Sequence, residues 1–206
     1  ARLDDYATQF GLGQSTGSEI GDVSGVLASP EWAEAHDREW TDGQTITAAI
    51  GQSYNAFTPL QLANYVATLV SGGEHYAAHL LKTVKSYDKS RLISAYDEEP
   101  IHDMNISDST MAAVTKGMHD LTHDSLTSAF SRCVVEAGAK TGSAQVGTDI
   151  ANGVFVAYAP YDDPEIAVAI VVEKGGSGSL LANAAVDIIN AWFSRGSNCS
   201  TAGENT

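Results

Sequence analysis

The chain has 206 residues, enough for a domain of ordinary size with a real hydrophobic core. Hydrophobic residues make up 43% of the sequence and charged residues 18%, so most of the chain is expected to fold. The formal net charge is −15, which argues against nucleic acid or an anionic membrane surface as the main partner, because no basic patch is available to neutralise phosphates.

Neither a membrane span nor a signal peptide is predicted. The sequence has no run of about 18 apolar residues, and no positively charged start that leads into an apolar segment. Because the chain opens with Ala1 and not with Met, we expect it to be trimmed, with room for an anchor upstream.

The first half of the chain begins with a short helix over residues 2–10 and a glycine-rich turn that ends near residue 21. Residues 23–44 show no clean period, which predicts an irregular segment that wraps over a surface. Thr58 and Pro59 are typical of an N-cap and a first helical position. The helix that follows is apolar nearly all round and is therefore expected to be buried. Its apolar positions are Leu60, Leu62, Ala63, Val66, Ala67, Leu69 and Val70.

The middle of the chain is predicted to hold an edge strand over residues 79–88 and a loop over residues 100–107. Ser107 or Asp108 then caps a helix that reaches residue 123. One face of that helix carries Met111, Val114, Met118 and Leu121.

Three apolar runs of strand character follow, over residues 133–146, 153–160 and 165–174. The turn signal between the second and third runs predicts an antiparallel hairpin. Residues 175–179 read as a flexible connector rather than a phosphate loop, and residues 179–195 as a last helix.

The order of helices, then three strands, then a terminal helix predicts an α+β fold. In this fold an antiparallel sheet carries the C-terminal helix, and a helical subregion lies beside it. Residues 1–196 are expected to belong to the domain and residues 197–206 to a flexible tail. Cys133 and Cys199 are either two free thiols or one disulfide, and their spacing leaves both alternatives open.

The stretch Gly138 to Gln145 contains the candidate functional residues. On a strand, Lys140 and Gly142 share one face, and Thr141 and Ser143 share the other. Hydroxyls beside an ammonium group can hold a carboxylate, and a glycine lets a ligand backbone approach closely. On the tripeptide Lys-Thr-Gly alone, an ordinary strand with a surface lysine is the favoured interpretation.

Three further segments give that tripeptide a context. Residues 10–25, residues 50–73 and the two strand-like runs after residue 152 look like segments of the class B penicillin-binding proteins. Together with the Lys-Thr-Gly triplet, they make the chain resemble the C-terminal portion of a D,D-transpeptidase domain, from about residue 5 to residue 195. Three departures from the family pattern, Ala139, Val154 and Ala157, are expected to affect substrate fit more than chemistry.

The resemblance implies an incomplete penicillin-binding, serine β-lactamase-like fold and a parent enzyme that cross-links cell-wall stem peptides through an acyl-serine. It implies catalytic roles for Lys140 and Ser143, and substrate binding by Thr141, Gly142 and Ser143. A non-catalytic penicillin-sensing or scaffold relative is the first alternative, and an unrelated extracellular binding domain the second.

The same resemblance implies partners and a location. The partners are stem peptides that end in D-Ala-D-Ala, β-lactam antibiotics and an N-terminal segment, without nucleic acid. The location is the extracytoplasmic face of a bacterial membrane, reached through an anchor outside this chain. No cofactor and no metal are expected.

The nucleophile is expected upstream of Ala1, because the family's serine motifs precede the segment that starts at Phe10. Ser86 to Lys89 and Ser53 to Asn55 match those motifs by spelling, but their surroundings do not fit. This chain alone is therefore expected to be inactive and to expose apolar surface that an N-terminal segment would cover.

Two His-x-x-x-His pairs, His75 with His79 and His119 with His123, have a spacing that can bind zinc on a helix. Neither pair has the glutamate of the zinc-protease pattern. The sequence therefore favours surface histidines over a metal site.

Overall fold

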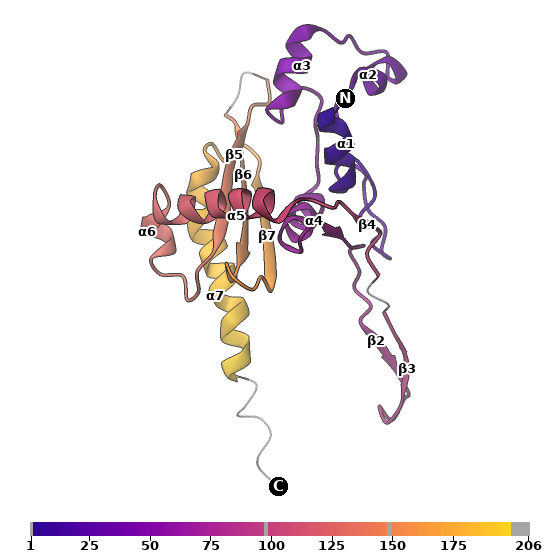
Figure 1. The fold of residues 1–206 in the computed structure, drawn as a ribbon, viewed down its shortest axis with the longest axis vertical. Helices are drawn as coiled ribbons and strands as arrows, with labels where there is room; N and C mark the ends of the chain where they lie inside the picture. Colours follow the sequence, from indigo (N-terminus) through magenta and orange to yellow (C-terminus); the bar gives the residue numbers. More distant parts are fainter. Residues whose placement is uncertain (1, 97–98, 148–149, 199–206) are drawn as a thin grey trace. The chain divides into compact units, whose positions relative to one another are not determined.

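The computed structural model describes residues 2–96, 99–147 and 150–198. The chain divides into two compact units, Ala1–Thr68 with Gly73–Asn105 and Leu69–Gly72 with Ile106–Thr206. Figure 1 shows the elements of each unit along the chain.

The first unit contains more helix than the sequence predicts. Its helices are α1 (Arg2–Gln9), α2 (Pro30–Ala35), α3 (Asp42–Ala49) and the greater part of α4 (Pro59–Val70). The prediction of an irregular segment over residues 23–44 is therefore wrong where α2 and α3 lie.

Local capping explains both unexpected helices. The Ser29 hydroxyl accepts a hydrogen bond from the Trp32 backbone N–H at 3.1 Å, and Pro30 occupies the first turn of α2. Thr41 and Gln44 form a capping box at the start of α3. These short-range bonds form helices in a stretch that has no apolar period.

Helix α4 begins where the sequence predicts. The Thr58 hydroxyl accepts from the Gln61 N–H at 3.1 Å, and the Gln61 side chain accepts from the Thr58 N–H at 2.9 Å. The predicted all-round burial is wrong, since Leu60 is 42% exposed. The polar Gln61 is buried instead, and its Nε2 donates to the carbonyls of Gln14 at 2.8 Å and Ser24 at 2.7 Å.

The strands described in the first unit are short. Strand β1 (Glu74–His75) pairs with β4 (His102–Asp103), and β2 (Thr83–Lys85) pairs with β3 (Leu92–Ala95), both antiparallel. The edge strand predicted over residues 79–88 is confirmed for the three residues of β2. The prediction of a loop over residues 100–107 is wrong at β4, because backbone hydrogen bonds pair this segment with β1, which follows α4.

The second unit is the predicted α+β arrangement. Strands β5 (Gly138–Ala144), β6 (Asn152–Ala159) and β7 (Ile166–Val172) form an antiparallel sheet in the order β5-β6-β7. Helix α5 (Asp108–His123) contacts β5, and α7 (Ala182–Asn198) contacts β6 and β7 from the other face (Figure 1). The short helix α6 (Thr127–Phe130) and the 3₁₀ turn η1 (Gly178–Leu181) were not predicted.

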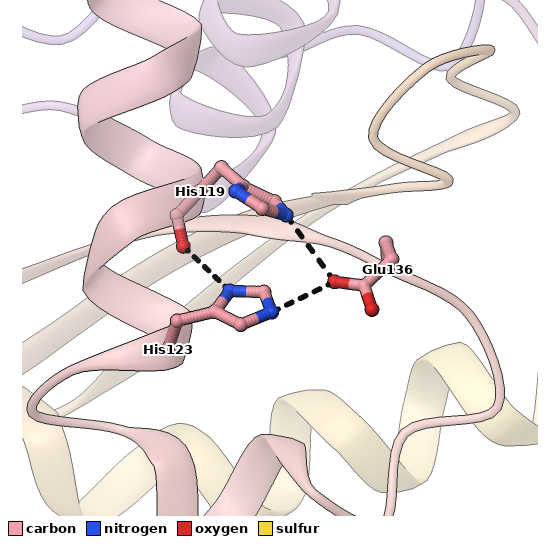
Figure 2. A group of neighbouring side chains, drawn as sticks. All are labelled: His119, His123 and Glu136. Atoms are coloured by element: carbon pink, nitrogen blue, oxygen red, sulfur yellow. Dashed lines mark hydrogen bonds and ion pairs between the residues drawn. The ribbon is translucent and has the colours of Figure 1, made fainter.

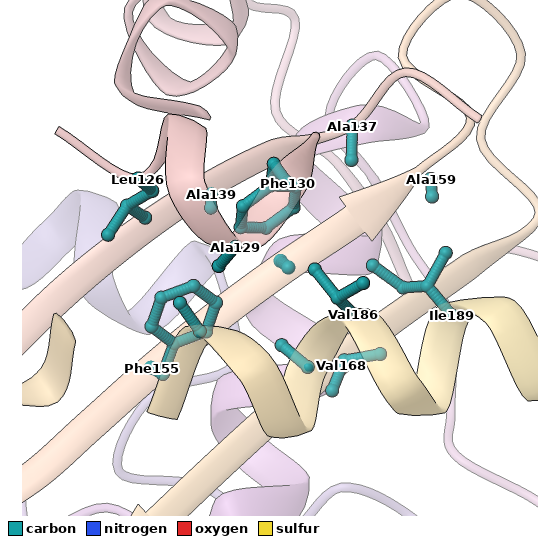
Figure 3. Close-up of a cluster of buried hydrophobic side chains, with 13 residues drawn as sticks. Leu126, Ala129, Phe130, Ala137, Ala139, Phe155, Ala159, Val168, Val186 and Ile189 are labelled. Atoms are coloured by element: carbon teal, nitrogen blue, oxygen red, sulfur yellow. The ribbon is translucent and has the colours of Figure 1, made fainter. Parts of the chain in front are cut away.

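The core of this unit lies between the sheet and helices α6 and α7 (Figure 3). Alternate residues of β6, namely Phe155, Ala157 and Ala159, point into it. Helix α7 contributes a matching stripe at helical spacing. That stripe is Ala182, Ala185, Val186 and Ile189, all nearly or fully buried.

Helix α7 runs to Asn198, so the described residues reach slightly past the predicted start of the tail at residue 197. Residues 199–206 lie outside the described residues. The alternative of a disulfide between Cys133 and Cys199 lies outside them for the same reason.

Candidate active site

Strand β5 brings the four predicted site residues into one continuous row. Thr141 is paired with Phe155 of the core, and Ser143 with Gly153, so the two hydroxyl residues lie on the α7 face of the sheet. Lys140 is paired with Val156 on the opposite face. The predicted division of the row between two faces is confirmed.

The exposure of β5 changes along its length. Gly138 and Ala139 are buried, whereas Lys140 and Ser143 are exposed. In the described sheet β5 is an edge strand, with β6 on one side only. The Lys140 ammonium group donates to the carbonyl oxygen of Thr141, so it lies along its own strand. The accessible end of an edge strand is suited to an extended ligand that binds through backbone hydrogen bonds.

A second segment, far along the chain, packs against the centre of this row. The Gly178 N–H donates to the Ser143 hydroxyl at 3.4 Å. A Cβ atom at Gly178 would lie 2.3 Å from the carbonyl oxygen of Gly142 and 2.2 Å from that of Val154. Both distances are far below van der Waals contact, so only glycine fits there. The prediction of a flexible connector over residues 175–179 is therefore wrong at Gly178. The glycines of this segment were the only sign in the sequence of such a close backbone approach.

The three departures from the family pattern take different positions. Ala139 and Ala157 are paired with each other and are fully buried in the core. Both side chains point into packed protein, which favours a role in stability over the expected role in substrate fit. Val154 lies beside the site row, since a Cβ atom at Gly142 would lie 3.5 Å from the Val154 Cβ.

The serines that match the nucleophile motifs by spelling occupy turns. Ser86 lies between β2 and β3, where its hydroxyl donates to Asp88 at 2.6 Å. Hydrogen bonds from Ser86 and then Ser90 lower the pKa of the Asp88 carboxyl to about 2. Neither Ser86 nor Ser53 starts a helix, as a nucleophile of this type requires.

In the turn that contains Ser53, the Asn55 side chain accepts a hydrogen bond from the Ala28 N–H at 2.8 Å and donates one to the carbonyl of Gln52 at 3.0 Å. Asn55 therefore has a structural role in holding this turn.

Of the four histidines predicted to lie at the surface, only His75 is buried. The Nε2 atom of His75 lies 3.0 Å from the Asn64 amide, and burial lowers the pKa of its imidazole. His119 and His123 do lie at the surface, but Glu136 joins them there (Figure 2). Nothing in the sequence spacing pointed to Glu136.

Among the described residues, no helix combines the length and the apolar character that crossing a bilayer requires.

Comparison with known proteins finds relatives that match nearly the whole of this chain. A family model described as the penicillin-binding protein transpeptidase domain matches residues 1–190. The peptidoglycan D,D-transpeptidase MrdA of Acinetobacter baumannii is 28% identical over 93% of this chain and 31% of its own length.

Two solved structures share the fold. Penicillin-binding protein 2B of Streptococcus pneumoniae superposes with a TM-score of 0.79, at 29% identity over 100% of this chain and 33% of the other. Penicillin-binding protein A of M. tuberculosis, solved as an imipenem acyl-enzyme complex, gives a TM-score of 0.76, at 25% identity over 93% of this chain and 41% of the other. The chain thus spans about a third of the length of the first relatives it matches.

Proposed function

The chain belongs to the family of penicillin-binding protein transpeptidase domains, and on this premise we propose that its parent protein is a peptidoglycan D,D-transpeptidase. The observation that carries the proposal is the position of Lys140, Thr141, Gly142 and Ser143 on the accessible end of an edge strand. The MrdA relative is named as a peptidoglycan D,D-transpeptidase, which supports the same reaction for the parent protein.

The reaction has two acyl transfers. A serine hydroxyl attacks the carbonyl carbon of the penultimate D-alanine, the peptide bond to the terminal D-alanine breaks, and that D-alanine leaves with a proton. An amine of a neighbouring stem peptide then attacks the acyl-serine ester, which restores the serine and forms the cross-link. We place the serine and its activating lysine in a segment that precedes this chain.

The residues of β5 have distinct roles in this proposal. The hydroxyls of Thr141 and Ser143, on one face, bind the terminal carboxylate of the substrate. The backbone N–H of Ser143 supplies one donor to the oxyanion that forms at the carbonyl under attack. Lys140, on the opposite face of the strand, contributes positive potential and helps to relay the proton. A β-lactam acylates the same serine because its carboxylate and carbonyl occupy the same positions.

The preceding segment also has a structural place in the proposal. Helix α7 exposes Ile188 by 43% and Trp192 by 42%, and β7 lies at the other edge of the described sheet. Further strands can pair with an unpaired sheet edge of this kind, and a further helix can cover exposed apolar side chains. We propose that the N-terminal segment supplies them, and that it also holds the anchor at the extracytoplasmic face of the membrane.

The test is acylation of the parent protein, including the residues that precede this chain. We expect a fluorescent penicillin to label it, and mass spectrometry of the digested product to place the label on a serine upstream of Ala1. We also expect release of D-alanine from a peptide that ends in D-Ala-D-Ala. Labelling without release of D-alanine would indicate the penicillin-sensing relative. A protein that is not labelled at all would contradict the proposal.

A further inference from the structure

Three metal-ligating side chains converge at the C-terminal end of α5 (Figure 2). His119 and His123 lie one helical turn apart, with ring centroids 4.3 Å from each other. Glu136 comes from the segment that leads into β5. One of its oxygens, Oε2, lies 3.2 Å from His119 Nε2 and 3.1 Å from His123 Nε2.

The contacts of His123 direct its Nε2 atom at the Glu136 carboxylate, 3.1 Å away. Its Nδ1 atom lies 3.2 Å from the carbonyl oxygen of His119 and 3.1 Å from the Thr122 hydroxyl oxygen. The carbonyl oxygen can only accept, so the tautomer with its proton on Nδ1 donates to it. That tautomer points the Nε2 lone pair at the carboxylate, which is the arrangement in which both atoms can bind one metal ion.

His119 points its Nε2 at the same carboxylate oxygen, 3.2 Å away. A divalent cation can accept the lone pairs of both Nε2 atoms and of Oε2 together. All three potential ligand atoms lie within 4.8 Å of one another.

We propose that His119, His123 and Glu136 bind one divalent transition-metal ion of the zinc type. With metal–ligand bonds of about 2.0–2.1 Å, neighbouring ligand atoms of a tetrahedral site lie about 3.3 Å apart. The two nitrogen–oxygen distances of 3.2 and 3.1 Å are within a few tenths of an ångström of that spacing. Two imidazoles and one carboxylate suit Zn²⁺, Co²⁺ or Ni²⁺, whereas Ca²⁺ and Mg²⁺ prefer oxygen ligands throughout.

The surroundings orient the ligands and leave the site open to solvent. The bond from His123 Nδ1 to a backbone carbonyl is the type of contact that fixes the tautomer of a metal-binding histidine. The His119 ring packs against Tyr161, with centroids 4.2 Å apart. The His123 side chain is 54% exposed and that of Glu136 is 65% exposed, so an ion can enter and keep water as its remaining ligand.

The ion would join two elements of the second unit. Both histidines belong to α5, whereas Glu136 lies two residues before β5, the strand that carries Lys140. A metal held by all three would therefore clamp the end of α5 to the start of the site strand. Binding to the folded protein alone raises the unfolding temperature.

The test is a calorimetric titration of ZnCl₂ into the metal-free parent protein. We compare the wild type with His123→Gln and Glu136→Gln, and with His36→Gln as a control at an exposed histidine of the first unit. The wild type and the control are expected to bind one equivalent more than either site variant, or to bind that equivalent at least about tenfold more tightly. Because the comparison is a difference, zinc bound elsewhere in the parent protein cancels.

Two further measurements keep the test decisive. Glu136→Gln retains both histidines and the size of the side chain, so circular dichroism spectra that match the wild type exclude misfolding as the cause of lost binding. Shifts of the His119 and His123 ring ¹⁵N resonances on addition of zinc identify the ligands directly. Equal zinc binding by the wild type and both site variants, or ring resonances that do not move, would overturn the proposal. Neither readout depends on penicillin acylation, so the metal site and the transpeptidase activity stand or fall separately.

Discussion

Gly178 lies against the backbone of Gly142, so closely that a Cβ atom on Gly178 would be 2.3 Å from the Gly142 carbonyl oxygen and 2.8 Å from its nitrogen. This contact connects the turn that follows β7 with the centre of the candidate site row. The position of the Lys-Thr-Gly strand therefore depends on a residue 36 positions further along the chain.

We expect Gly178→Ala to displace this turn, to cost about 1–3 kcal/mol of stability by overpacking, and to slow acylation of the parent protein. Gly117→Ala is the control, because no atom lies within 4 Å of the Cβ position there and the residue is helical. The control is expected to be neutral or stabilising by about 0.5–1 kcal/mol. Chemical denaturation measures both changes, and equal stability of the two variants would contradict the packing argument.

The Ala139–Ala157 pair predicts a change in stability without a change in chemistry. Both side chains are fully buried and are paired across β5 and β6. Replacing either by glycine, the residue typical of the family, is expected to cost about 0.5–1 kcal/mol, because glycine loses more conformational freedom on folding. The rate of acylation by a fluorescent penicillin should stay within about twofold, because both side chains point into packed protein. A twofold change in rate corresponds to about 0.4 kcal/mol in the activation free energy. A tenfold change in that rate would show that the pair acts on the substrate after all.

The sequence predicts well those features that local patterns determine. The Thr58 cap, the hairpin of β6 and β7 and the alternation along β5 all follow from neighbouring residues. Prediction from the sequence fails for contacts between residues that are far apart along the chain. The approach of Gly178 to Gly142 and the position of Glu136 beside two histidines depend on how the elements pack, which local periodicity does not encode. Helices α2 and α3 are a third kind of feature. Capping hydrogen bonds stabilise both helices, although their sequences lack the apolar pattern from which a helix is predicted.

Tyr158 gives a prediction for alkaline pH. Its ring is fully buried, its hydroxyl has no hydrogen-bond partner among the described residues, and burial raises its pKa to about 12. A pKa raised on folding means that the neutral form is favoured in the native state. The stability linked to Tyr158 is therefore present below about pH 10, the ordinary pKa of tyrosine, and is lost as the pH rises toward 12.

Tyr158→Phe removes both the unpaired hydroxyl and the titration. We expect this variant to be as stable as the wild type at pH 7 or more stable by up to about 1 kcal/mol. We also expect a shallower loss of stability than in the wild type between pH 10 and 12. Tyr87→Phe is the control, because Tyr87 is fully exposed. Denaturation midpoints across this range measure the difference, and parallel curves for wild type and Tyr158→Phe would contradict the assignment.

Gln61 gives a prediction for the first unit. Its amide group donates to the carbonyls of Gln14 and Ser24 from a buried position, which holds the glycine-rich segment against α4. Gln61→Ala removes the three hydrogen bonds of this amide, two to these carbonyls and one from the Thr58 N–H, and is expected to cost about 1.5–4.5 kcal/mol, from about 0.5–1.5 kcal/mol for each bond. Leu60→Ala, at an exposed position of the same helix, should cost less than about 1 kcal/mol. Comparable losses in the two variants would contradict the role of Gln61.

The most direct test of the account is the rate of acylation of the parent protein by a fluorescent penicillin after Lys140→Ala. Lys85→Ala is the matched control, at an exposed lysine on β2. The account predicts a rate at least about 100-fold lower for Lys140→Ala, in the range that follows loss of one electrostatic contact to a developing oxyanion, and a rate like the wild type for Lys85→Ala. Acylation of a folded Lys140→Ala protein at the wild-type rate would contradict the central claim that β5 forms one wall of an acyl-transfer site.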